Sequence, residues 1–207
     1  MSDSADTLSD LAPSDLDRQL AFLREADRLK TVLRASRLTD DSRRENSGEH
    51  SWHVALYALV LADQAAPDVS IDRVIRMLLI HDLVEIDVGD TPIHGTFDAA
   101  DIAAREQRAA DRIFGLLPSE LASSFRALWD EFEAACTPDA IFAKAIDRVQ
   151  PVMHNIALGG GTWQEFGVTE ELLERRVGSK IARGAPDLWH HVRALTEGYL
   201  PAGRAAK

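Results

Sequence analysis

The segment LLIHDLVEIDVGD (residues 78–90) sets one histidine, three aspartates and one glutamate against an apolar helical pattern. In a helix, the adjacent residues His81 and Asp82 point about 100° apart, and Glu85 follows on the same side. Burying such a cluster costs several kcal/mol unless its charges are paired, and a divalent cation would pair them. Alternatively, Asp82 only orients a core histidine or caps a neighbouring helix, so the choice depends on ligands elsewhere.

Two other segments carry further candidate ligands. GEHSWH (residues 48–53) contains His50 in the first turn of an expected helix and His53 almost one turn later. AKAIDRV (residues 143–149) contains Asp147 on an apolar stretch, where an unpaired carboxylate is costly. A salt bridge with Arg148 or Lys144 would also account for Asp147, so none of these residues is decisive alone.

Histidine imidazoles combined with carboxylates suit a borderline-to-hard divalent ion such as Mn, Co, Fe, Ni or Mg, completed by water. A structural zinc site is normally richer in cysteine, and Cys136 alone cannot build one. The single cysteine also excludes an internal disulfide. A lone cysteine and an acidic N-terminal segment that does not resemble a signal peptide together favour a cytoplasmic location.

The elements that position these residues are expected to be helices, because apolar residues recur with helical periodicity through nearly the whole chain. No segment alternates convincingly between polar and apolar residues, and no repeat or low-complexity linker divides the chain. Pro151 is expected to kink its helix or end the regular part, and residues 159–163 read as a loop. The expected helices are 14–34, 48–66, 70–89, 98–117, 119–135, 137–158, 169–182 and one beginning at 186.

The whole pattern predicts one all-α domain at residues 14–200, between an acidic leader at 1–13, expected to be flexible, and a tail at 201–207. With 207 residues, 45% of them hydrophobic, one substantial core is expected. The formal net charge of −11 argues against nucleic-acid polymers and membrane surfaces as partners. A small anion can bind only where local cations or a metal overcome that charge.

Three segments in order, RRENSGEHSWHVA (43–55), LLIHDLVEIDVGD and KAIDRV, resemble the HD-domain metal-dependent phosphohydrolases. The branch they most resemble contains the bacterial 5′-deoxynucleotidases and the eukaryotic HD-domain-containing protein 2, over roughly residues 23–195. The resemblance implies an HD-domain helical bundle with one divalent metal ion per chain. It also implies an enzyme that hydrolyses nucleoside 5′-monophosphates by a metal-bound water, and a homodimer.

The resemblance assigns roles to individual residues. Glu85 would exchange protons with the attacking water or the leaving alkoxide, and Asp90 would lie at the sugar side of the substrate unless it is only a turn aspartate. His53 is the alternative to His50 as a ligand, although the family's EHS element favours His50. The implied metal ligands are His50, His81, Asp82 and Asp147.

The resemblance also implies that Arg34 holds the phosphate, while Arg43 and Arg44 could reach the same pocket or simply be solvated. In the bacterial deoxynucleotidases a tryptophan follows that arginine and helps exclude the ribose 2′-hydroxyl. Ala35 stands in its place here, so ribonucleotides or other small phosphate esters are also expected substrates.

Other functions on the same fold stay open. A second metal site using His94 would indicate a phosphodiesterase or a dinuclear oxygenase, but one histidine between Asp82 and Asp147 is fewer than such sites use. A non-catalytic nucleotide sensor would be expected to lack a ligand, and all four are present. His154, His190 and His191 are expected to be surface or packing residues. Trp129, Phe132 and Trp189 either complete the core or offer an apolar dimer surface.

Overall fold

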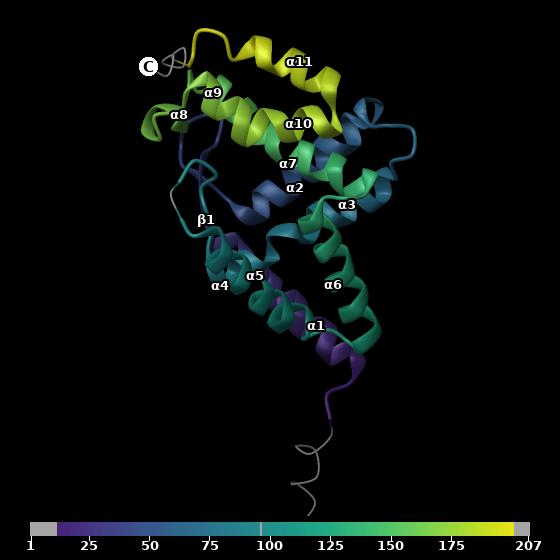
Figure 1. The fold of residues 1–207 in the computed structure, drawn as a ribbon. Coiled ribbons are helices and arrows are strands. Elements are labelled where there is room, and N and C mark those ends of the chain that lie inside the picture. Colours follow the sequence, from purple (N-terminus) through teal and green to yellow (C-terminus); the bar gives the residue numbers. More distant parts are fainter. Residues whose placement is uncertain (1–11, 96, 201–207) are drawn as a thin grey trace, which may run out of the picture.

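The computed structural model describes residues 12–95 and 97–200, and these are predominantly helical (Figure 1). The predicted all-α class is therefore confirmed, while the leader and the tail lie almost wholly outside the described residues. The α-helices are α1 (Asp15–Ala26), α2 (Ser47–Val60), α3 (Ile71–Ile80), α4 (Glu85–Val88), α5 (Ala99–Phe114), α6 (Ser119–Ala134), α7 (Pro138–Ala157), α8 (Thr162–Glu165), α9 (Glu170–Leu173), α10 (Ser179–Gly184) and α11 (Pro186–Leu195). None of the described helices is long and apolar enough to cross a membrane.

Shorter helical turns join several of these helices. The 3₁₀ turns are η1 (Asp27–Thr31), η2 (Ala62–Gln64) and η3 (His81–Val84), and a π-helical turn, η4 (Glu174–Gly178), connects α9 to α10. The expected helix at 169–182 therefore exists as a run of α, π and α turns.

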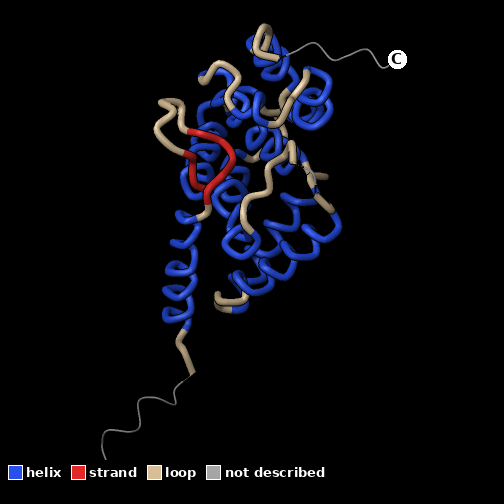
Figure 2. Tube along the Cα trace, turned by 90° about the vertical axis from the view of Figure 1, so that its left-hand side faces the viewer, coloured by secondary structure: helices blue, strands red, loops and turns tan. Residues whose placement is uncertain are grey.

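The helix predicted at 14–34 ends early, and a small antiparallel hairpin follows it. Strand β1 (Leu33–Arg37) pairs with β2 (Arg44–Asn46), with Leu33 opposite Asn46 and Arg37 opposite Arg44 (Figure 2). The sequence did not predict these strands, because their inward-facing residues are charged: Arg34 and Glu45 are 9% and 1% exposed. A search for apolar alternation cannot find a strand whose buried positions are an arginine and a glutamate.

The helices enclose two clusters of buried apolar side chains. One lies among α2, α3, α7, α10 and α11 in the upper part of Figure 1, and the other among α1, α5 and α6 in the lower part. Trp129 and Phe132 on α6 are each 1% exposed, and Trp189 is 5% exposed. These three aromatic residues complete the core, so the apolar surface considered for them in the sequence is absent.

The helix predicted at 70–89 is interrupted directly before two candidate metal ligands, His81 and Asp82. The α-helix ends at Ile80, whose φ of −115° departs from the usual α-helical value, and η3 carries the chain into α4. The indole of Trp129 donates a hydrogen bond to the carbonyl oxygen of His81 (3.1 Å). Gly89, with φ of +78°, then ends α4 in a conformation that favours glycine. The break places His81 and Asp82 between the two apolar clusters.

Helix α7 is the central scaffold. Thr137 caps its first turn by accepting from the backbone N–H of Ala140 (3.2 Å), and Pro138 occupies the first helical position, as the sequence predicted. The helix continues through Pro151 to Ala157 rather than ending there. Because proline has no N–H, the carbonyl of Asp147 lacks its usual helical donor at this point.

Candidate metal centre and adjoining pocket

Four predicted ligands meet between the two apolar clusters. His50 comes from α2, His81 and Asp82 from η3, and Asp147 from α7, and each is at least nine-tenths buried. His50 Nε2 lies 2.9 Å from Asp147 Oδ1 and 3.9 Å from Asp82 Oδ2. His81 Nε2 lies 3.0 Å from Asp82 Oδ1 and 3.5 Å from Asp147 Oδ1. These four residues are called the first cluster below.

The start of α2 is held in a way that fixes His50. Asn46 Oδ1 accepts from the backbone N–H of Glu49 (2.9 Å), and Glu49 Oε2 accepts from the N–H of Asn46 (3.1 Å). This reciprocal capping arrangement stabilises the first helical turn. His50, in that turn, is therefore presented from a rigid position.

The hydrogen bonds of the two imidazoles decide which nitrogen is free. His81 Nδ1 donates to the carbonyl oxygen of Leu78 (2.8 Å), and His50 Nδ1 lies 3.0 Å from Gln150 Oε1, which can only accept. Both rings therefore carry a proton on Nδ1 and direct Nε2 at the carboxylates. His81 Nε2 is buried and makes no hydrogen bond to any described residue. Imidazole nitrogens and carboxylate oxygens that face one another are stabilised by a cation between them. The residues present therefore fit a divalent metal ion.

The electrostatics of the first cluster agree with that fit. Burial lowers the pKa of His81, but the carboxylates of Asp82 and Asp147 outweigh burial and raise it to about 10. Burial acts in the opposite sense on Asp82, where His81 and Arg34 nevertheless hold the pKa below its usual range. The site therefore stabilises positive charge at its centre.

Arg34 reaches this centre from β1. Its Nη1 donates to Asp82 Oδ2 (2.8 Å) and lies 3.7 Å from both Glu85 Oε1 and Asp90 Oδ1. Glu45 Oε2 is 3.9 Å from its Nε. Burial lowers the pKa of Arg34, but the carboxylates of Asp82, Glu85 and Asp90 outweigh it and raise that pKa, so Arg34 stays charged beside the first cluster.

Glu85 and Asp90 lie on the same side of the centre as Arg34. Ser47 Oγ donates to Glu85 Oε2 (2.5 Å), and Asp90 Oδ2 accepts from the backbone N–H of Ala35 (3.1 Å). Burial, followed by the charges of Asp82 and Asp90, raises the pKa of Glu85 to about 8 against the opposing effect of Arg34. A carboxyl group with that pKa can hold a proton near neutral pH and release it.

The two arginines that precede α2 do not reach this site. Arg44 is exposed on β2, and Arg43 is exposed and pairs with both carboxylate oxygens of Glu49 (2.8 and 2.6 Å). A different arginine, Arg148, stands beside the centre with Nε 3.5 Å from Asp147 Oδ2. Sequence reasoning considered Arg148 only as a salt-bridge partner, although its position directly after a ligand was the available signal.

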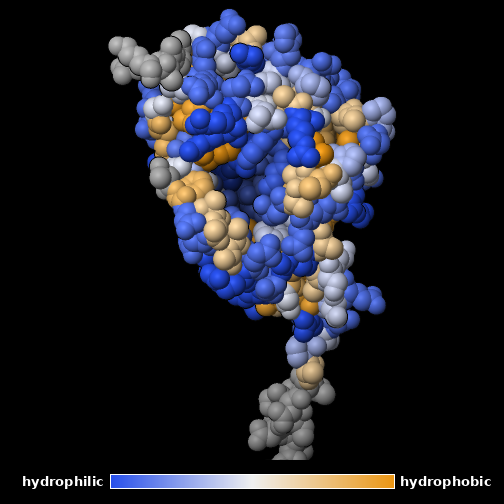
Figure 3. All heavy atoms as spheres, viewed as in Figure 1, coloured by the Kyte–Doolittle hydropathy of each residue, from blue (hydrophilic) through white to orange (hydrophobic). Residues whose placement is uncertain are grey.

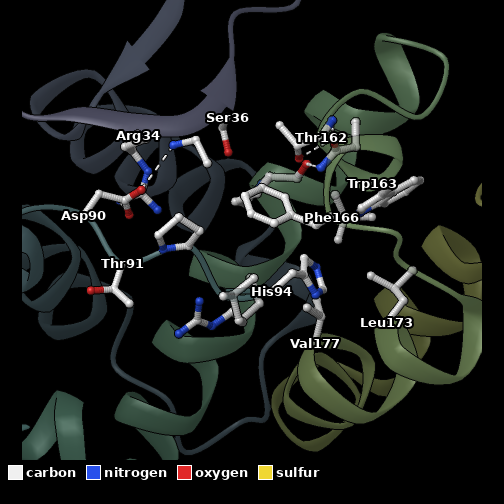
Figure 4. A pocket seen from close by; sticks show the side chains of 17 residues that line it. Arg34, Ser36, Asp90, Thr91, His94, Thr162, Trp163, Phe166, Leu173 and Val177 are labelled. Atoms are coloured by element: carbon white, nitrogen blue, oxygen red, sulfur yellow. Dashed lines mark hydrogen bonds and ion pairs between the residues drawn. The ribbon is translucent and has the colours of Figure 1, made fainter. Parts of the chain in front are cut away.

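An open pocket of about 610 Å³ adjoins the first cluster (Figure 4). In that view Arg34 and Asp90 lie at one end, while Trp163 and Leu173 lie at the other. On the face drawn in Figure 3, the surface is hollowed near its centre and hydrophilic atoms line the hollow. The pocket is lined by Arg34, Ala35, Ser36, Asp90, Thr91, Pro92, Ile93, His94, Arg148, Pro151, Val152, Asn155, Thr162, Trp163, Phe166, Leu173 and Val177.

His94 lines the pocket and is not one of the grouped ligands. Burial first, and then the charges of Arg176 and Arg148, lower its pKa to about 4. Two arginines facing a neutral imidazole oppose a second cation there. Among the described residues, His94 therefore belongs to the pocket wall rather than to a dinuclear centre.

Three polar residues that support the site were not singled out from the sequence. Ser47 holds Glu85, Gln150 holds His50, and Glu45 accepts from Gln150 Nε2 (2.7 Å). Each is at most 1% exposed. For Ser47 and Gln150 the signal available was a polar residue three positions from a ligand on the same helix, which is common and therefore weak; Glu45 lies on β2 and offered no such signal.

Comparisons with known proteins agree with this geometry. The HD domain family model matches residues 26–189. A human protein named 5′-deoxynucleotidase HDDC2 is 30% identical over 135 residues, which are 65% of this chain and 65% of the human protein. The alignment therefore spans slightly less than two thirds of that relative. The Danio rerio protein of the same name is 28% identical over 162 residues, or 75% of this chain and 80% of its own.

Solved structures show the same fold. A protein from Magnetospirillum magnetotacticum MS-1, described as a predicted metal-dependent phosphohydrolase, is 50% identical with a TM-score of 0.86 and covers 92% of this chain and 97% of its own. The PH0347 protein of Pyrococcus horikoshii OT3 is 22% identical with a TM-score of 0.64, covering 85% of this chain and 99% of its own. The second likeness supports the fold alone.

Proposed function

Because this chain belongs to the HD domain family, we propose that it is a metal-dependent phosphomonoesterase that hydrolyses nucleoside 5′-monophosphates. The observation that carries the proposal is the pair of buried Nε2 atoms, on His50 and His81, that face two carboxylates beside a pocket. Relatives named 5′-deoxynucleotidase point to the same substrate class.

One divalent ion, Mn, Co, Fe, Ni or Mg, would be held by the four residues of the first cluster. When bound, such an ion supplies a Lewis acid for phosphoryl oxygens and lowers the pKa of a coordinated water. The protein's part is to orient both imidazoles: the acceptors of Leu78 and Gln150 hold Nδ1, so that Nε2 faces the ion.

Glu85 is the proposed proton carrier. Hydrolysis forms a bond from water oxygen to phosphorus and breaks the bond from phosphorus to the 5′-oxygen of the sugar, which must then gain a proton. Ser47 holds Glu85 Oε2, so Oε1 is the oxygen available to exchange that proton. The pKa of about 8 keeps a proton on Glu85 near neutral pH. Asp90, anchored on Ala35, would orient the sugar beside it.

Arg34 is the proposed phosphate-binding residue, and Arg148 is a second cation at the pocket. Both line the pocket, and a guanidinium group offers the forked donors that phosphate accepts. In a chain of net charge −11, two such cations beside a metal meet the condition for binding an anion. The prediction that Arg44 also binds phosphate gains no support from its exposed position on β2.

The nucleoside would extend from Arg34 and Asp90 toward the apolar walls of the pocket (Figure 4). Aromatic and aliphatic side chains such as Phe166 and Ile93 provide faces for a base without requiring one base. Ala35, where the resembling deoxynucleotidases have tryptophan, leaves room at the sugar. We therefore propose that ribonucleotides are accepted alongside deoxyribonucleotides.

Phosphate release from a panel of nucleoside 5′-monophosphates tests this function. The protein would be stripped of metal, and Mn, Co, Mg, Ni or Zn would be restored singly, with Asp82→Ala as the control. We expect release that requires a metal and is lost in the variant. Tight metal binding without release from any monophosphate would contradict the substrate class and favour a nucleotide sensor.

We also propose a homodimer in a reducing, cytoplasmic compartment. The outer face of α2 carries an apolar stripe whose members are 40–69% exposed: Trp52, Leu56, Leu59 and Val60. Contiguous apolar surface of this kind is typical of an interface between copies. The exposed thiol of Cys136 suits a reducing environment. Light scattering on the wild type and on Leu59→Glu would test the dimer, which the variant should dissociate.

A further inference from the structure

A second group of metal-ligand side chains lies outside the first cluster. Glu45 on β2, His53 on α2 and His154 on α7 place ligand atoms within 4.8 Å of one another. Glu45 and His154 are 1% and 4% exposed, and His53 is half-buried. These three residues are called the second cluster below. From the sequence, His53 was considered only as an alternative to His50 in the first cluster, and His154 only as a surface or packing residue.

The three ligand atoms converge on one point, which the side-chain nitrogen of Gln150 occupies. Gln150 Nε2 lies 2.7 Å from Glu45 Oε1, 3.2 Å from His53 Nδ1 and 3.1 Å from His154 Nε2. All three atoms are therefore directed at a single position rather than at separate partners.

The convergence point is surrounded by more hydrogen-bond acceptors than the Gln150 amide nitrogen has N–H groups to donate. A carboxamide nitrogen has two N–H groups, so Gln150 can satisfy at most two of the three atoms around it. Turning the amide over is no remedy, because its oxygen would then lie 2.7 Å from the carboxylate oxygen of Glu45. One lone pair of the second cluster thus stays unpaired in a largely buried place, which is unfavourable.

Both imidazoles of the second cluster are available as neutral ligands. Burial lowers the pKa of His53 and of His154, in each case against the opposing charge of Glu45. Two neutral imidazoles and one carboxylate form a ligand set that zinc accepts with a further position open to water. A cation at the convergence point would satisfy all three atoms at once.

We propose that Glu45, His53 and His154 bind a second divalent ion of the zinc class at the point where the Gln150 amide nitrogen lies. Binding requires the buried Gln150 side chain to move aside and give up its hydrogen bond to His50, and the ion enters past the half-buried His53. The second cluster shares no residue with the first, so this ion is separate from the one proposed for hydrolysis.

Counting bound zinc tests the proposal without reference to activity. Metal-stripped protein would be titrated with Zn²⁺ against a chromophoric chelator, in the full chain and in an Asp82→Ala variant that impairs the first cluster. We expect two ions per chain in the wild type and one in Asp82→Ala. Because the readout is bound metal, failure of the proposed hydrolysis would not affect it.

Substitutions in the Asp82→Ala background assign the remaining ion. Adding His154→Ala or the nearly isosteric Glu45→Gln should remove it, while adding His190→Ala, at an exposed histidine on α11, should not. Circular dichroism would confirm that each variant is folded. An Asp82→Ala protein that binds no ion, or one whose ion survives both His154→Ala and Glu45→Gln, would overturn the proposal.

The Gln150→Ala variant distinguishes a metal-binding second cluster from one that only forms structural hydrogen bonds. Removing the amide clears the convergence point, so affinity for zinc at the second cluster should rise severalfold. The same change removes the acceptor that orients His50, so affinity at the first cluster should fall by about tenfold or more. A fall in affinity at both clusters would contradict the second site.

Discussion

The first and second clusters contain similar ligand atoms but differ in what stands at their centres. In the first, the imidazoles of His50 and His81 face carboxylates, and Arg34 approaches only from the edge. In the second, the Gln150 amide fills the middle. Arg34 and Arg148, which contact Asp82 and Asp147 of the first cluster, also line the pocket, although none of the ligands of either cluster does. Ligand type alone therefore does not distinguish a catalytic metal centre from a site that only binds metal. The group at the centre of each cluster and the cluster's access to substrate make that distinction.

The largest difference between the clusters should appear when each loses a carboxylate charge. Asp147→Asn should lower phosphate release by about 10³-fold or more, because the metal would lose a ligand on which hydrolysis depends. Glu45→Gln, the matched change in the second cluster, should reduce release by less than about tenfold. Initial rates at saturating Mn²⁺ would measure both. Equal losses would mean that the clusters act as one centre.

A change next to the first cluster should separate chemistry from metal binding. Glu85→Gln should lower kcat by about 10²-fold or more, since general acid–base groups typically contribute at least that much. Metal content should stay near the wild-type value, because Glu85 is not a proposed ligand. Steady-state rates and elemental analysis on one preparation would show this. Loss of metal together with kcat would make Glu85 a ligand instead.

The two arginines expected to bind phosphate should respond unequally. Arg34→Lys keeps the charge but loses the forked donors, so kcat/KM should fall by about tenfold. Arg44→Lys, the matched change at an exposed position, should leave kcat/KM within about twofold. Measuring both with one monophosphate would sharpen the contrast between the centre and the surface. A larger effect at Arg44 would indicate that β2 moves toward the substrate.

The smallest expected effect is a pH dependence of stability in the metal-free protein. The pKa of Glu85 is raised from 4.5 to about 8, so the folded state holds a proton that the unfolded chain loses. This contribution is fully present below pH 4.5 and is lost as pH rises toward 8, lowering the free energy of unfolding by a few kcal/mol.

Chemical denaturation of the wild type and of Glu85→Gln would isolate that contribution. The difference in unfolding free energy between the two proteins should decrease as pH rises from 4.5 to 8. Taking the difference is necessary because His94, whose pKa is lowered to about 4, acts in the opposite sense below pH 6.5. A difference that does not vary with pH would place the pKa of Glu85 near its ordinary value.

The helical class and the four proposed ligands could be read from the sequence because ordered local motifs carry them. HD, EHS and KAID each place a titratable residue beside an apolar helical pattern, and packing then brings the patterns together. The break at Ile80 could not be read, because the hydrogen bond from Trp129 that accompanies it comes from 48 residues away.

The supporting residues were harder to predict for a similar reason. Gln150 and Glu45 are 105 residues apart and become informative only when the hairpin meets α7. The hairpin itself was hidden because Arg34 and Glu45 fill its inward positions, where apolar residues are normally sought. Long-range polar contacts leave little trace in local periodicity, so the second cluster required the structure.

The most direct test of this account compares the two clusters in one assay. Phosphate release from a 2′-deoxynucleoside 5′-monophosphate would be measured for metal-stripped wild type, Asp147→Asn and His154→Ala, each with and without Mn²⁺. The account predicts Mn²⁺-dependent release by the wild type and by His154→Ala, and almost none by Asp147→Asn. Release that persists in Asp147→Asn, or that needs no metal in the wild type, would contradict it.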